Sequence, residues 1–363
     1  MLLTNLPEER VLMKKTRASN IELLRILTIC GVVVLHYNGY FGFSAATPGS
    51  LNFHILSVLE VLFICAVNLF VLISGYFLCE STQRKAIKVV ELVVQVMVIG
   101  VVKYGLSLLF GSTAFSLSGL VGSALPNNYF VTFYLTLYLL SPYLNVLLNK
   151  LSQKQFSALL CLSFCLFSLW PTLLDLLSEM GHPFWGLYTT NTEGSQAGYS
   201  ILNFMLMYLL GAYLKKYPVT FAPWKYGIGF AVCVAILALL QLYFPAVARA
   251  YSNPLVVAEA VLLFLLFQRL HFSSKPVNTL AAGTFTCFLL HDVFLSEIDI
   301  PQAVNAPAPL MIGHMLLSVS LIFLACWVVW KVYHLISRPV YVWLDRKLSP
   351  INRWLSVEET EER

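Results

Sequence analysis

The chain has 363 residues, of which 58% are hydrophobic and 11% are charged, with a formal net charge of +5. A soluble domain carries about a quarter charged residues, so this composition excludes an ordinary water-soluble fold. The apolar residues fall in runs of roughly 17 to 25, each long enough to cross a hydrocarbon core of about 30 Å. Because backbone amides in lipid must bond within their own segment, we predict an all-α, polytopic membrane bundle.

About ten transmembrane helices are predicted, with polar or Pro- and Gly-containing loops between them. Their ranges are 21–40, 54–78, 87–110, 128–149, 156–177, 199–214, 224–244, 253–270, 279–297 and 309–336. The sixth run is short for a span, and the last is long. We divide the chain into an N-terminal segment, 1–20, a transmembrane domain, 21–340, and a C-terminal tail, 341–363.

Basic residues are present in every second loop and nearly absent from the others. They precede the first helix and follow the second, fourth, sixth, eighth and tenth, whereas the intervening loops carry only Arg249. Cytoplasmic loops are enriched in Lys and Arg, so the pattern predicts that both termini are cytoplasmic in a multi-pass protein of the plasma membrane. Since topology explains these charges, we expect no nucleic-acid partner.

Ionisable side chains inside the predicted helices are informative, because burying a charge in a membrane is costly. Glu22, Glu91 and Lys103 lie near helix ends, where they can snorkel to the surface. The deeper ones are Arg25, His36, Glu60, Glu259, His291 and Asp292. Cys161 and Cys165 are four apart, but no His or acidic cluster accompanies them, so we expect no metal site.

Arg25 and His36 are eleven residues apart on the first helix. At about 100° per residue, this spacing puts them on one face, roughly 16 Å apart along the axis. We therefore expect both to line one conduit, with Arg25 near the cytoplasmic surface and His36 deep in the membrane. A histidine there can take and return a proton near neutral pH. The alternatives are an Arg25 anchor paired with Glu22 and a buried, structural His36.

His291 and Asp292 lie in the ninth helix, where adjacent residues diverge by about 100°, so Asp292 need not orient His291. A polar contact between helices is the alternative to a catalytic His291. Glu60 and Glu259 could each pair with a histidine or with Arg25, and the sequence does not choose between these partners. Asn68 and Gly75 in the second helix favour close packing and interhelical hydrogen bonding.

Four stretches carry a further signal. They are 20–36, in which Arg25 and His36 enclose ten residues, 68–77, 129–145 with its Leu140-Ser-Pro-Tyr segment, and 284–291. In this order they resemble the acyltransferase-3 family of membrane proteins, and the resemblance extends from residue 17 to about 345. One departure is Arg338 before Pro339, where many relatives have an acidic residue.

The resemblance implies an O-acyltransferase that moves an acyl group, often acetyl, from cytoplasmic acyl-CoA to a hydroxyl of a cell-surface or exported polysaccharide or its lipid-linked precursor. Acetyl-CoA or another acyl-CoA would then be the donor substrate, with no permanently bound cofactor. The expected partners are acyl-CoA, a carbohydrate acceptor and the lipid bilayer of a bacterial plasma membrane, and the oligomeric state stays open.

On this basis we predict that Arg25, with Arg84, Lys85 and Lys88, holds the CoA phosphates. His36 is the predicted general base toward the acceptor hydroxyl, and a covalent acyl-histidine step is a less favoured alternative. The further catalytic candidates are Arg25, Glu60 and His291. The alternative function is a transporter or flippase for a sugar-containing substrate, which would often show inverted repeats that this sequence lacks. A structural subunit of an export complex would leave the placement of Arg25 and His36 unexplained.

Overall fold

The computed structural model describes residues 18–191 and 194–357. Arg10, Lys14, Lys15 and Arg17 of the predicted basic N-terminus lie outside the described residues, as does the charged tail 358–363. In the described part all ten predicted segments are helical, so the all-α membrane bundle is confirmed. Eight described helical runs are long and apolar enough to cross a membrane, while α10 and α13 are shorter, with 16 and 15 residues.

The helices up to the middle of the chain are α1 (Ser19–Tyr37), α2 (Phe43–Ala45), α3 (Leu51–Phe63), α4 (Ala66–Leu78), α5 (Ala86–Leu109), α6 (Leu117–Ala124), α7 (Tyr129–Lys150), α8 (Gln153–Phe164) and α9 (Trp170–Glu179). They are followed by α10 (Ile201–Lys216), α11 (Pro223–Tyr243), α12 (Pro245–Ala248), α13 (Pro254–Gln268), α14 (Lys275–Leu280), α15 (Thr284–Leu295), α16 (Ile300–Val304) and α17 (Ala308–Leu348). Two π-helical turns, η1 (Asn38–Gly42) and η2 (Cys165–Leu169), join α1 to α2 and α8 to α9 without a break. The remaining short turns are the 3₁₀ segments η3 (Gln196–Gly198), η4 (Ala281–Gly283) and η5 (Ser349–Leu355).

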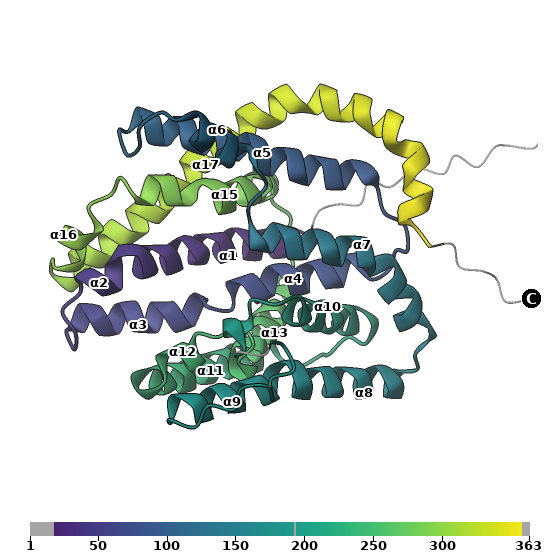
Figure 1. Cartoon of the computed structure of the whole chain (residues 1–363). Coiled ribbons are helices and arrows are strands. Elements are labelled where there is room, and N and C mark those ends of the chain that lie inside the picture. The colour runs from purple at the N-terminus through teal and green to yellow at the C-terminus, as the bar shows by residue number, and fades with distance from the viewer. Residues whose placement is uncertain (1–17, 192–193, 358–363) are drawn as a thin grey trace, which may run out of the picture.

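Helix α1 lies in the middle of the bundle, between two groups of helices (Figure 1). Ile21 and Leu24 pack into a hydrophobic cluster with α4, α10 and α13. Ile29, farther along α1, packs into a second cluster with α3, α15 and α17. Because α1 contributes to both clusters, neighbours from two groups of helices hold it in place, and with it Arg25 and His36.

The loops that carry basic residues meet at one end of the bundle, where α4, α7 and α10 end, and we call this the basic end. Lys215 pairs with Glu80 across 3.3 Å, and the Lys216 ammonium donates a hydrogen bond to the Leu148 carbonyl at 2.7 Å. These two contacts tie the last turn of α10 to the ends of α4 and α7. The grouping agrees with the loop pattern of the sequence, and the cytoplasmic orientation of the basic end stays a prediction.

Helices α4 and α10 pack with their backbones in contact. A Cβ atom built on Gly211 would lie 2.1 Å from the Leu72 carbonyl oxygen, and one built on Gly75 would lie 2.3 Å from the Tyr208 carbonyl oxygen. Neither neighbour is a flexible side chain, so only glycine fits at either position. The same pair of helices is joined by side-chain hydrogen bonding, as predicted from Asn68 and Gly75.

In that network the Asn203 amide donates to the Asn68 side-chain oxygen at 3.0 Å, and the Asn68 amide donates to the Tyr251 carbonyl at 2.8 Å. Asn68 and Asn203 are both about 1% exposed. Buried amides of this kind need partners within the protein, because hydrocarbon provides none.

The last helix is longer than the sequence predicts. The predicted helix ends at residue 336, before Arg338 and Pro339, whereas α17 continues to Leu348 with Pro339 inside it. A proline removes one backbone hydrogen bond but does not end a helix that is held on both sides. Here the first half of α17 packs on α15, and the second half lies along α5 (Figure 1). The predicted boundary between domain and tail therefore falls inside a helix.

Prediction on the α4–α10 contact. Gly211→Ala should destabilise the protein by about 1–3 kcal/mol, because the new methyl group overpacks against the Leu72 backbone. Gly227→Ala in α11 is the matched control, since a Cβ atom there meets nothing within 4 Å. Thermal unfolding of both variants in one detergent measures the difference. Equal melting temperatures would show that α4 and α10 are not in backbone contact.

Candidate functional site

Two histidines from distant parts of the sequence meet inside the bundle. The ring of His36 on α1 lies 4.6 Å from the ring of His291 on α15, edge to face, when the distance is taken between centroids. Tyr40, in the π-helical turn that follows α1, lies 5.1 Å from His36 on the same measure. His36 and His291, both predicted as catalytic candidates, are therefore neighbours.

The hydrogen bonding of His291 fixes its tautomer. Its Nδ1 atom lies 2.8 Å from the Cys287 carbonyl oxygen, one turn back on α15. A carbonyl only accepts, so Nδ1 carries the hydrogen, and the neutral ring has a lone pair on Nε2. Nε2 is buried and has no hydrogen-bond partner among the described residues. The pair thus presents a buried acceptor on His291 beside the more accessible His36 ring.

An ion pair adjoins the two histidines. The Lys103 ammonium on α5 contacts the carboxylate of Asp292, the residue after His291. The Lys103 and Asp292 side chains are 39% and 26% exposed, so the pair is neither fully buried nor freely solvated. It joins α5 to α15 and fixes the direction of the α15 turn that carries His291.

The sequence did not predict this pair. It placed Lys103 near a helix end, although α5 continues for six residues after it to Leu109, and it left Asp292 without a partner. One signal was available, because a lone cation and a lone anion inside apolar helices tend to pair with each other.

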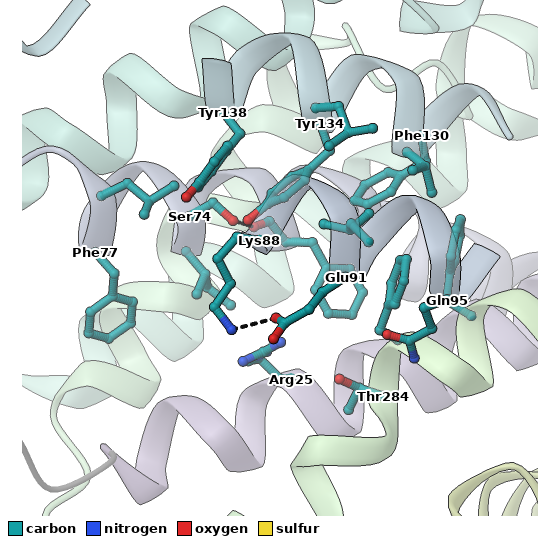
Figure 2. A pocket seen from close by; sticks show the side chains of 18 residues that line it. Arg25, Ser74, Phe77, Lys88, Glu91, Gln95, Phe130, Tyr134, Tyr138 and Thr284 are labelled. Carbon is teal, nitrogen blue, oxygen red and sulfur yellow. Dashed lines mark hydrogen bonds and ion pairs between the residues drawn. The ribbon is translucent and has the colours of Figure 1, made fainter. Parts of the chain in front are cut away.

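A cavity of about 530 Å³, which we call the donor-side cavity, opens among α1, α4, α5, α7 and α15 (Figure 2). Most of its wall is apolar or aromatic, from residues that include Phe70, Phe77, Phe130, Tyr134, Tyr138, Phe285 and Phe288. Its charged residues are Arg25, Lys88 and Glu91, from α1 and α5. Figure 2 shows the Arg25 guanidinium beside the Lys88–Glu91 pair. The cavity is thus charged on one side and largely apolar over the rest of its wall, where Ser74, Gln95 and Thr284 are the polar exceptions among aromatic and aliphatic residues.

Both cations of this cavity already have carboxylate partners. Lys88 contacts Glu91 at 2.6 Å, and Arg25 contacts Glu22 at 3.5 Å, the pairing considered from the sequence. The Lys88 and Arg25 side chains are 58% and 38% exposed. Exposed ion pairs contribute about 0–1 kcal/mol, so a polyanion can displace Glu91 from Lys88 at little cost. The Glu22 side chain is only 13% exposed, so its displacement from Arg25 leaves a carboxylate with little contact with water.

The sequence predicted that Arg25 and His36 line one conduit, and the structure corrects this prediction. Both lie on α1, but Arg25 lines the donor-side cavity and His36 does not. The cavity reaches Phe288 on α15, and His291 follows one turn later. A shared helix face does not produce a shared cavity, because the side chains of neighbouring helices divide the space along it.

Arg84, predicted to bind CoA phosphates, has a different position. It is 3% exposed, and its Nε and Nη2 atoms donate to the Ser141 hydroxyl at 2.9 and 2.6 Å. Its remaining N–H groups donate to the carbonyls of Leu78, Ser81 and Gln83. All five guanidinium donors are therefore used within the protein. The structure thus corrects this prediction, since Arg84 has no donor left for phosphate.

The partner of Arg84 explains the Ser-Pro segment of α7. Pro142 has no N–H, so the Tyr138 carbonyl one turn earlier has no helical donor. The Ser141 hydroxyl donates to that carbonyl at 2.7 Å, and its lone pairs accept the two bonds from Arg84. One turn later, Asn145 donates to the carbonyls at the end of α4. The segment therefore locks α4 to α7, which is a structural role.

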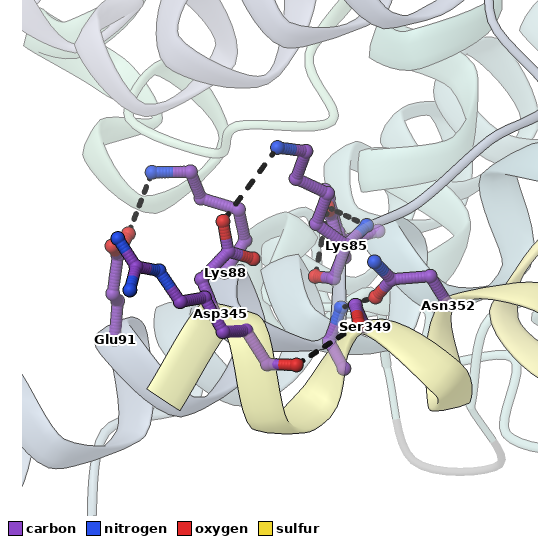
Figure 3. Close-up of polar contacts among 9 residues, drawn as sticks. Lys85, Lys88, Glu91, Asp345, Ser349 and Asn352 are labelled. Carbon is purple, nitrogen blue, oxygen red and sulfur yellow. Dashed lines mark hydrogen bonds and ion pairs between the residues drawn. The ribbon is translucent and has the colours of Figure 1, made fainter. Parts of the chain in front are cut away.

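Lys85 lies outside the donor-side cavity, where the end of the chain packs on the start of α5 (Figure 3). Its ammonium lies 3.9 Å from the Asp345 carboxylate of α17. The Asn352 side chain accepts from the Ala86 amide at 2.8 Å, so it caps the first turn of α5, which has no capping side chain of its own. Lys85 is thus available at the surface, held weakly.

The two predicted carboxylates make no hydrogen bond or ion pair with either histidine among the described residues. Glu60 on α3 accepts a hydrogen bond from Asn38 at 3.0 Å. Glu259 on α13 is fully buried, and neither of its oxygens has a hydrogen-bond partner among the described residues. Neither pairs with Arg25 or with a histidine, so the suggested pairings and the catalytic assignment of Glu60 lose their support.

Comparison with protein families decides the class of this site. A family model described as an acyltransferase domain, that of the acyltransferase-3 family, matches residues 19–334. The chain belongs to the acyltransferase-3 family. No curated protein and no solved structure matches it significantly. The protein is therefore a multi-pass membrane acyltransferase, and the resemblance found in its motifs is confirmed.

Prediction on the Lys103–Asp292 pair. Lys103→Met in this acyltransferase should destabilise it by less than the ~3–5 kcal/mol typical of a fully buried pair, because Asp292 keeps some solvent access. If the pair orients the α15 turn that carries His291, the double variant Lys103→Met with Asp292→Leu should recover the melting temperature of the parent protein. It should not recover acyl transfer. Transfer restored together with stability would refute the orienting role.

Proposed function

We propose that this acyltransferase moves an acyl group, acetyl first of all, from acyl-CoA to a hydroxyl of a cell-surface or exported polysaccharide or its lipid-linked precursor. The setting we propose is the plasma membrane of a bacterium. The observation that carries the proposal is the donor-side cavity. It has two cations with carboxylate partners on one side, is apolar over most of its wall, and ends one turn before the histidine pair.

The shape of acyl-CoA suits such a cavity. Its nucleotide end is polyanionic, and its pantetheine arm is long, thin and only weakly polar. Arg25 and Lys88 would bind the phosphates. Each would exchange its carboxylate partner for phosphate groups, which carry more negative charge. Lys85, released from Asp345, would add a third cation at the surface. The arm would occupy the apolar length and bring the thioester toward α15.

The chemistry then needs one proton acceptor. His36 removes the proton from the acceptor hydroxyl as its oxygen attacks the thioester carbonyl. The tetrahedral intermediate collapses, the C–S bond breaks, and the thiolate of CoA leaves with the proton from the His36 imidazolium. The products are an ester and free CoA, so atoms and charges balance. His291, whose Nε2 lone pair has no partner, would hold the neighbouring ring or the incoming hydroxyl.

A transporter remains the alternative from sequence. Family membership favours group transfer over transport, and the adjoining histidines supply a base that a passive conduit does not need.

Prediction on His36. His36→Ala should lower acetyl transfer from acetyl-CoA about 10²–10⁴-fold, the usual contribution of a general base, while acetyl-CoA binding stays unchanged. His54→Ala is the matched control, since His54 is exposed on α3. Transfer of radiolabelled acetyl groups by purified protein measures the effect. Full activity of His36→Ala at normal protein levels would end the proposal.

Prediction on the donor phosphates. Arg25→Ala should weaken acetyl-CoA binding about tenfold or more, because charge-assisted hydrogen bonds to phosphate are lost. Acetyl-pantetheine, which lacks the phosphates, should bind the variant and the parent protein equally. Lys154→Ala, which removes an exposed charge from the start of α8, is the control. Arg84→Lys can reduce the amount of folded protein, but the folded fraction should bind acetyl-CoA with unchanged affinity. Equal acetyl-CoA affinities for Arg25→Ala and the parent protein would refute the role of Arg25.

A further inference from the structure

A second cavity, of about 430 Å³, lies among α5, α6, α15 and the loops before α6 and α7, and we call it the polar cavity. Its polar lining residues are Lys103, Tyr104, Ser107, Ser112, Thr113, Ser123, Asn127 and Asn128. Apolar atoms come from Val96, Leu125 and Leu289. Its wall therefore mixes hydroxyl, amide and ammonium groups with small apolar surfaces, unlike the largely apolar wall of the donor-side cavity.

The two cavities border the same two helices, α5 and α15, at adjacent residues. On α5 the donor-side cavity ends at Gln95 and the polar cavity begins at Val96. On α15, Phe288 lines the donor-side cavity and Leu289 lines the polar cavity. Near the start of α7, Phe130 lines the donor-side cavity and Asn128, the residue before the helix, lines the polar cavity. Adjacent residues on a helix diverge by about 100°, so the two cavities border different faces of α5 and α15 at one level of the bundle. His291 is two residues after Leu289, so it lies close to this level but on another face of α15.

Lys103 connects the polar cavity to the histidines. It is a lining residue, and its ammonium contacts Asp292, which adjoins His291. A hydroxyl compound that binds beside Lys103 therefore lies next to the site where its proton would be removed.

Several polar groups of this wall have no partner among the described residues. The side chains of Thr113 and Asn127 make no hydrogen bond there, and the Asn128 amide uses only its oxygen, which accepts from the Val131 backbone. Amide and hydroxyl groups left free around a cavity suit a ligand rich in hydroxyls, because each can donate or accept.

The short helix α6 forms one side of the polar cavity and is firmly attached to α5. A Cβ atom on Gly100 would lie 2.1 Å from the Ser123 carbonyl oxygen, so the backbones touch. The Tyr104 hydroxyl accepts from the Ser116 amide at 2.8 Å and donates to the Ser116 carbonyl at 3.0 Å, just before α6 begins. The wall is thus preorganised by its own contacts.

We infer that the polar cavity is the acceptor subsite, where a single sugar ring binds with its hydroxyls on the free amide and hydroxyl groups and its C–H face on the apolar residues. This inference rests on the proposed acyl transfer, and it adds which part of the chain binds the acceptor. A lipid alcohol would need a continuous apolar wall, which this cavity does not offer.

The test fills the cavity without disturbing its wall. Gly122 lines the polar cavity, and a Cβ atom on it meets nothing within 4 Å. Gly122→Leu therefore adds volume inside the cavity and favours the α6 helix. Gly105→Leu on α5 is the matched control, because Gly105 is equally unobstructed and does not line the cavity.

Binding of methyl β-glucopyranoside and of its N-acetylglucosamine analogue to the full chain in nanodiscs is measured by saturation-transfer NMR. We expect Gly122→Leu to weaken the binding at least tenfold, and Gly105→Leu to leave it unchanged. Equal glycoside binding by the parent protein, Gly122→Leu and Gly105→Leu would overturn the assignment. A parent protein that binds dodecanol but neither glycoside would overturn it too.

Acetyl-CoA affinity, measured separately on the same three proteins, distinguishes this inference from the proposed function. A parent protein without affinity for acetyl-CoA would defeat the proposed transfer. Glycoside binding that Gly122→Leu abolishes would still locate a sugar in the polar cavity.

Discussion

Hydrocarbon offers no hydrogen-bond partner, so polar side chains between the ends of this bundle must find partners within the protein. This constraint explains most of the contacts that hold the helices at their present angles. Asn68 and Asn203 join α4 to α10, Arg84 with Ser141 joins α4 to α7, and the Lys103–Asp292 pair joins α5 to α15. The proposed chemistry uses a group left over from this pairing, the His291 Nε2 atom.

Much of the fold could be predicted from the sequence, because apolar runs of membrane length leave few alternatives to helices. The finer features could not. The two π-helical turns, the break between α3 and α4 at Ile64 and Cys65, and the extension of α17 past Pro339 depend on packing rather than on composition. Periodicity does not reveal where a neighbouring helix will hold a chain straight or bend it.

The site was predictable to the extent that its residues are rare. Arg25, His36 and His291 were identified because charges in apolar helices are uncommon, and the structure brings the two histidines together. Arg84 was misassigned because a basic residue in a basic loop gives no sign of being buried. Only its hydrogen bonds to Ser141 and to the end of α4 separate a structural arginine from a ligand-binding one.

The attachment of the chain's end to the start of α5 has a consequence for biogenesis. Ala86 is translated before α7 to α15, whereas Asp345, which holds Lys85, and Asn352, whose side chain accepts the Ala86 amide, follow these helices in the chain. These bonds cannot form while the ribosome is still adding α7 to α15. The surface at the start of α5 is therefore completed only after α17 has been made.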